Sequence, residues 1–275
     1  MLGSATLQAW ANLRRMRGPG EQKAILLALL LTPGSARERQ AWAEETRGVM
    51  TAGAGLLLVD QLPAAARLPA IEAMLVQCAE LPLEQRQAML QAARRVMCAD
   101  GRVRPIDRLL LIRVRHGLNG PVAAHRGGVR DANELSGLPL ALRQAIAELS
   151  AYLARLVPVA DPHARVGAAG AAWHQAVVQV VWGGAPHPPT CQVPDSAALV
   201  HVLRVIQDLG WMRRPVLVRA WMDAVQTSQP ESDVPRLGPP LSLTGAEALR
   251  MACGLLDTPV PPDLARYFNA LPQQG

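Results

Sequence analysis

The chain has 275 residues, of which 50% are hydrophobic, 18% charged and 3% aromatic, and its formal net charge is +6. This apolar content excludes a disordered chain, and the length is sufficient for one large or two ordinary domains with their own cores. Because alanine, leucine and valine supply most of the apolar residues, we expect close-packed helices. The few scattered aromatic residues argue against a stacking platform for single-stranded nucleic acid.

The apolar residues of the first block, residues 1–118, recur at steps of three and four, which is typical of amphipathic helices. Residues 57–62 also fit a short strand. Pro69 is expected in the first turn of a helix, where proline is tolerated. The pattern predicts helices over residues 21–31, 36–50, 69–79, 81–101 and 105–118.

Residues 119–138 are rich in glycine and polar residues, which predicts a loop or linker before a second helical block, residues 139–275. Residues 166–185 carry no charge, but His174 and several polar or glycine positions favour a buried helix over a membrane span. The fold class predicted is therefore all-α, a multi-helix bundle of two blocks packed together. In the second block, helices are predicted over residues 139–155, 164–181, 195–209, 214–225 and 244–256.

The charge and the cysteines constrain the partners and the compartment. Lys23 is the one lysine among 28 basic residues, and the others are arginines. These arginines are dispersed along the sequence, which is more typical of solvated helix faces than of one continuous basic surface that binds nucleic acid. A membrane-surface role stays open, since a basic chain is attracted to anionic lipid. The four cysteines show no zinc-ligand or disulfide spacing, and residues 1–16 lack the apolar core of a signal peptide. We therefore predict a cytoplasmic protein without a transmembrane span.

The run Ala99-Asp100-Gly101-Arg102-Val103, followed by Asp107, is a turn between two predicted helices that resembles the acidic turn of TerB-like helical domains. The wider run over residues 23–118 is similar to the region after the catalytic domain in HtpX-type, membrane-anchored zinc metallopeptidases of proteobacteria. Residues 216–225 and 245–256 are interpreted as a degenerate second copy of the helix pair. The resemblance implies two TerB-like blocks, cytoplasmic and accessory to proteolysis or envelope stress.

The motifs of the common hydrolases are missing from the sequence. It contains no His-Glu-x-x-His helix for zinc, no Gly-x-Ser-x-Gly elbow and no phosphate loop. His174, beside Trp173, is interpreted as a core or groove histidine rather than a base. We therefore predict a protein that is not an enzyme and has no cofactor. Its predicted role is an interaction or accessory module that holds a protein partner in an apolar groove between its two blocks.

Asp100 and Asp107 leave a second function open, a metal-responsive TerB-like domain that binds a divalent cation. Hard cations prefer several oxygen ligands in a negatively charged setting. Residues 100–108 contain three arginines and two aspartates, so this segment is net positive and repels a divalent cation. The competing interpretation is that Asp100 accepts backbone N–H groups in the turn while Asp107 supports the start of the next helix. A third function, a basic binder of nucleic acid or a membrane surface, also stays open.

Overall fold

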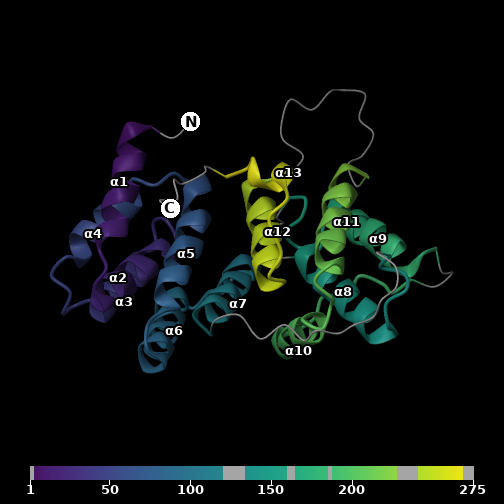
Figure 1. The fold of residues 1–275 in the computed structure, drawn as a ribbon, viewed down its shortest axis with the longest axis horizontal. Helices are drawn as coiled ribbons and strands as arrows, with labels where there is room; N and C mark the ends of the chain where they lie inside the picture. The colour runs from purple at the N-terminus through teal and green to yellow at the C-terminus, as the bar shows by residue number, and fades with distance from the viewer. Residues whose placement is uncertain (1–2, 120–133, 160–164, 185–187, 228–240, 269–275) are drawn as a thin grey trace. The chain divides into compact units, whose positions relative to one another are not determined.

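In the described residues of the computed structural model, α-helices are the regular secondary structure and no strand occurs (Figure 1). The predicted all-α class is therefore confirmed. The chain divides into two compact units, which are residues 1–122 with 266–275 (unit 1) and residues 123–265 (unit 2). The described ranges are residues 3–119, 134–159, 165–184, 188–227 and 241–268.

Most of the predicted linker, residues 120–133, lies outside the described residues, as do residues 228–240 of a second predicted loop. The domain boundaries predicted at residues 119 and 138 therefore stay a prediction. None of the described helices combines the length and the hydrophobicity needed to cross a bilayer.

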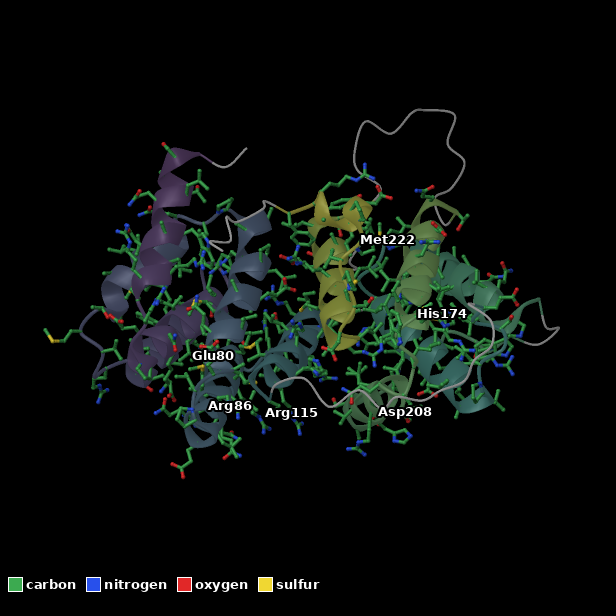
Figure 2. The ribbon with its side chains drawn as sticks, viewed as in Figure 1. Glu80, Arg86, Arg115, His174, Asp208 and Met222 are labelled. Atoms are coloured by element: carbon green, nitrogen blue, oxygen red, sulfur yellow. The ribbon has the colours of Figure 1, made fainter. Side chains whose placement is uncertain are left out.

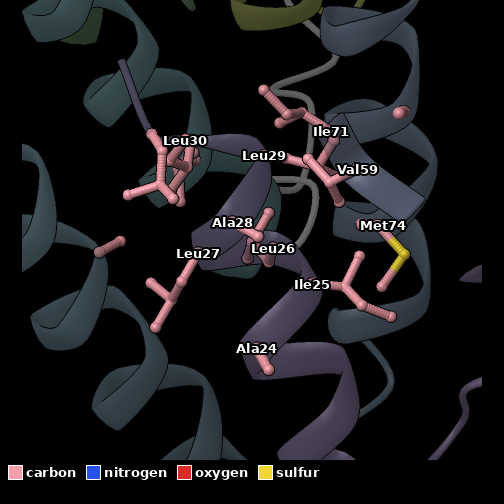
Figure 3. Packing of buried hydrophobic residues seen from close by; sticks show 14 of the residues in the cluster. Ala24, Ile25, Leu26, Leu27, Ala28, Leu29, Leu30, Val59, Ile71 and Met74 are labelled. Atoms are coloured by element: carbon pink, nitrogen blue, oxygen red, sulfur yellow. The ribbon is translucent and has the colours of Figure 1, made fainter. Parts of the chain in front are cut away.

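Helix α2 forms the centre of unit 1, where it packs against α3, α4, α5 and α6. Its residues Ala24 to Leu29 are at most 3% exposed, so this short apolar run is buried on all sides (Figure 3). Ile71 and Met74 of α5 and Val59 of α4 belong to the same core cluster. The helices of unit 1 are α1 (Ser4–Arg15), α2 (Pro19–Leu29), α3 (Ala36–Glu45), α4 (Ala52–Asp60), α5 (Ala64–Cys78), α6 (Leu83–Met97) and α7 (Pro105–Asn119).

One alternative and one predicted detail of unit 1 are not observed. Most of residues 57–62 belong to helix α4 rather than to a strand, because Gly55 and Val59 are buried four residues apart while Leu57 is 67% exposed. Pro69 lies inside α5 instead of in its first turn. The neighbouring residues of Pro69 are buried, so we attribute the continuous helix to tertiary packing that outweighs the hydrogen bond lost at proline.

Unit 2 is organised around α8, which packs against both α9 and α10, while α11 packs against α9 and α12. Its largest fully buried side chains are Trp173, Trp221 and Tyr152. Residues 168–182 of the predicted uncharged segment form α9, which buries one face in this core. The helices of unit 2 are α8 (Leu140–Leu153), α9 (Ala168–Trp182), α10 (Ser196–Ile206), α11 (Arg213–Thr227), α12 (Leu243–Leu255) and α13 (Pro262–Ala265).

Arginine side chains from the first turns of some helices bind the carbonyl groups at the ends of others. Arg67 of α5 donates to Ala28 O near the end of α2, and Arg86 of α6 donates to Leu118 O near the end of α7. The last carbonyls of a helix have no partner within it and lie at its negative end, so a guanidinium group both satisfies and neutralises them. Arg214 of α11 repeats the arrangement in unit 2 and donates to the carbonyl oxygens of Gln207, Leu209 and Leu256.

Candidate functional site

The acidic turn lies between α6 and α7, and its two aspartates make local hydrogen bonds. Asp100 Oδ1 accepts the backbone N–H of Arg102 at 2.8 Å, and Asp107 Oδ2 accepts that of Arg104 at 3.0 Å. Gly101 has a φ of +74°, which glycine adopts without strain. Both carboxylates therefore stabilise the turn and the start of α7, as the competing interpretation of the sequence expects.

Arg104 supplies the positive charge that faces these carboxylates. Its guanidinium group binds both oxygens of Asp107, with Nε to Oδ2 at 2.8 Å and Nη2 to Oδ1 at 2.7 Å, and it also donates to Thr32. The hydrogen bonds with Asp107 raise the pKa of Arg104 against the effect of burial, and the charges of Glu38 and Asp100 contribute further. In the part of the chain that the structure describes, no three His, Cys, Asp or Glu side chains are grouped so that they could hold a metal ion. A cation site at Asp100 and Asp107 stays a prediction.

His174 is a core histidine, as the sequence predicts. Its side chain lies in unit 2 on α9, where it is 2% exposed, and its Nε2 lies 3.2 Å from Ala147 O (Figure 2). Burial lowers the pKa of His174, so the neutral imidazole donates to this carbonyl. The thiols of Cys78 and Cys191 are protonated as well, because burial raises both pKa values, to about 12 for Cys78.

A groove of about 510 Å³ opens on the surface of unit 2 between α9 and α11. Its floor is formed by small side chains, because Ala220 and Ala224 are nearly buried, while Val180 stands on its rim and is 53% exposed. Such a mixture of small apolar residues with a few polar groups is typical of a concave binding surface. The groove is lined by Ala176, Gln179, Val180, Val216, Arg219, Ala220, Asp223, Ala224 and Thr227.

Two buried tryptophans fix the walls of this groove. Trp173 Nε1 on α9 donates to Trp221 O on α11 at 2.9 Å, and Trp221 Nε1 donates to Ser150 Oγ on α8 at 2.9 Å. Helix α9 also approaches the end of α8 closely, since a Cβ atom on Gly170 would lie 2.0 Å from Ala154 O. The three helices α8, α9 and α11 are thus held together by specific contacts that position the walls of the groove.

Arg219 and Asp223 place opposite charges inside the groove. They lie four residues apart on α11, and both are exposed. Within the described residues neither side chain forms an ion pair, although a pair at this spacing is able to meet on a helix surface. Both charges therefore remain available to a partner.

The groove was not predicted from the sequence, in which residues 216–225 are interpreted only as part of a degenerate second copy of the helix pair. The available signal was the segment from Val216 to Thr227, in which an Arg-Ala pair is followed four residues later by an Asp-Ala pair. This spacing predicts a row of alanines next to a row of charged residues on one helix, but it does not indicate that α9 packs against this helix. The predicted groove between the two blocks stays a prediction, and the groove described above lies within unit 2 alone.

Comparisons of the chain with protein-family models, with curated proteins and with solved structures found no match. The TerB-like resemblance therefore stays a prediction, and the site is interpreted from its own geometry.

Proposed function

We propose that the chain is a non-catalytic helical interaction module that binds a protein partner through the α9–α11 groove. The observation that carries this proposal is the combination of an alanine floor, an exposed Val180 and two unpaired charges on helices locked by Trp173 and Trp221. A groove that combines an apolar floor with a few charged side chains is suited to receive an amphipathic helix.

The state of the reactive side chains supports the non-catalytic part of the proposal. His174 is buried and donates its ring N–H to a carbonyl oxygen, and the thiol of Cys78 is buried and protonated, so these two residues lack the exposure and the ionisation that a base or nucleophile needs. Cys191 is half-buried, and burial raises the pKa of its thiol as well. From the sequence resemblance we further propose that the module is cytoplasmic and serves proteolysis at a membrane or the response to envelope stress.

Site-specific photo-crosslinking in the native cells tests the proposed surface. A photoreactive phenylalanine analogue is placed at Val180 in the groove or, as the matched control, at Val200 on α10, which is 40% exposed outside the groove. We expect a defined protein adduct from position 180 and none from position 200. Equal labelling from both positions, or none from 180, would overturn the proposal. Chelator-sensitive casein hydrolysis by the purified chain would overturn its non-catalytic part.

A further inference from the structure

We infer that the protein bound in the α9–α11 groove is a second copy of the same chain, so that two copies associate through α11 about a two-fold axis. This inference rests on the proposed function, because it names the partner of the same groove. The charges of Arg219 and Asp223 indicate a second copy rather than an unrelated helix.

A two-fold symmetric interface is isologous, so residue i of one copy meets residue j of the other, and j meets i. When two α11 helices cross antiparallel at the level of residue 221, positions two residues before and two residues after the crossing face each other. Arg219 of each copy then faces Asp223 of the other, and both charges, which have no ion-pair partner within one copy, become paired. A foreign helix would need the opposite charges at the matching spacing, whereas a second copy always carries them.

The side chains around this charge pair fit close helix packing. Ala220 and Ala224 on α11 and Ala176 on α9 are small enough to let a facing helix approach the groove floor. Val180 and Val216 project at the sides and become buried when α9 and α11 of both copies form a four-helix arrangement. The apolar contacts provide the driving force, and the two ion pairs select the antiparallel register.

Charge reversal in the full-length chain tests this arrangement. Light scattering after gel filtration, or sedimentation equilibrium, measures the dimer fraction of the wild type, of Arg219→Asp, of Asp223→Arg and of the variant that carries both changes. Each single reversal places like charges opposite each other twice, so we expect the association constant to fall about ten-fold or more. The double variant restores two attractive pairs, and we expect it to dimerise as the wild type does.

A second charge pair of the same kind provides the control. Arg204 and Asp208 lie four residues apart at the end of α10, are both exposed, and do not line the groove. Reversal of either charge should leave the dimer fraction unchanged. Circular dichroism and thermal melting establish that every variant is folded, which we expect because Arg219 and Asp223 make no ion pair within one described chain.

Three results would overturn the second-copy inference, and they separate it from the proposed function. A wild type that stays monomeric at high micromolar concentration, a folded double variant that stays monomeric, or a reversal at Arg204 that acts as strongly as one at Arg219 each contradicts it. If the chain is monomeric but position 180 crosslinks to a different protein, and this adduct is lost in the double variant, the inference fails while the proposed function stands. If position 180 yields no adduct at all, both fail.

Discussion

Arg214 concentrates three hydrogen bonds to carbonyl oxygens on one buried side chain. It is 7% exposed, and its three nitrogens donate to carbonyl oxygens at distances from 2.6 to 3.0 Å. These carbonyls lie at or beyond the ends of α10 and α12, so one guanidinium group joins two helix ends to the start of α11. A buried charge of this kind is stabilising only while all of its hydrogen bonds are made.

Replacement of Arg214 by methionine should therefore destabilise unit 2 although the volume of the side chain is nearly kept. We expect the free energy of unfolding to fall by about 3 kcal/mol, because three carbonyl groups lose their donor in a buried place. Urea denaturation followed by circular dichroism measures the change. Arg204→Met at an exposed position of α10 serves as the control and should stay within about 0.5 kcal/mol of the wild type. Equal stability of the two variants would contradict the proposed capping role.

Glu45 joins three helices of unit 1 through ion pairs. Its carboxylate accepts from Lys23 Nζ on α2 at 3.0 Å and from Arg95 Nε on α6, while its own backbone carbonyl accepts a further hydrogen bond from Lys23. The hydrogen bond with Arg95 is the largest cause that lowers the pKa of Glu45, from 4.5 to about 2, and Lys23 adds to it against the effect of burial.

A lowered pKa predicts how this contribution to stability depends on pH. Because the folded pKa of Glu45 lies below the unfolded value of 4.5, the stabilisation is fully present above pH 4.5 and is lost as the pH falls toward 2. The partner Arg95 is 59% exposed, so we expect Glu45→Gln to cost only about 1 kcal/mol at neutral pH. Urea titrations at stepped pH should show this difference shrinking below pH 4.5. A difference that stays constant down to the acid limit would contradict the assignment, and Glu44→Gln at the exposed neighbouring position is the control.

At the scale of the elements, the contact between α8 and α9 depends on the absence of a side chain at Gly170. A Cβ atom there would lie 2.0 Å from Ala154 O and 3.0 Å from its carbonyl carbon, so the backbones would have to separate. Gly53 on α4 offers the opposite case, because nothing lies within 4 Å of the corresponding Cβ position.

The same substitution should therefore have opposite effects at these two helical glycines. Gly170→Ala is expected to lower the free energy of unfolding by about 1–3 kcal/mol through steric strain, although alanine is the better helix former. Gly53→Ala should raise it by up to about 1 kcal/mol, since only the helix propensity changes. Thermal and urea denaturation of both variants provide the comparison. A stabilising Gly170→Ala would show that the two helices pack less closely than described.

The positions of the elements were largely predictable, whereas their contacts were not. The helix over residues 105–118 and the core position of His174 follow from local apolar spacing, and both are observed. The helix that contains Pro69 and the helical state of residues 57–60 depend on packing of α5 and α4 against α2, which no local pattern contains. The groove was missed for the same reason, because it exists only where α9 and α11 pack side by side.

At the scale of the whole molecule, the count of 28 basic residues overstates the positive charge that is free to bind a polyanion. Several arginines are committed to protein groups, either to carboxylates, as Arg39 to Asp60 and Arg104 to Asp107, or to helix ends, as Arg86 and Arg214. A guanidinium group that already binds a carboxylate or a carbonyl has to give up that partner before it contacts a phosphate. The exposed arginines that remain are spread over many helices.

This distribution predicts weak, non-specific binding to nucleic acid, in contrast to the third function that the sequence left open. Fluorescence anisotropy with a labelled duplex should give a Kd no tighter than about 10⁻⁶ M at physiological salt, the range of purely electrostatic association. A plot of the logarithm of the association constant against the logarithm of salt concentration should have a shallow slope. Each phosphate contact steepens this slope by about 0.9, and few arginines are able to contact one duplex together. Nanomolar affinity with a steep slope would show that the dispersed arginines converge on one face, and it would favour the nucleic-acid function over the groove.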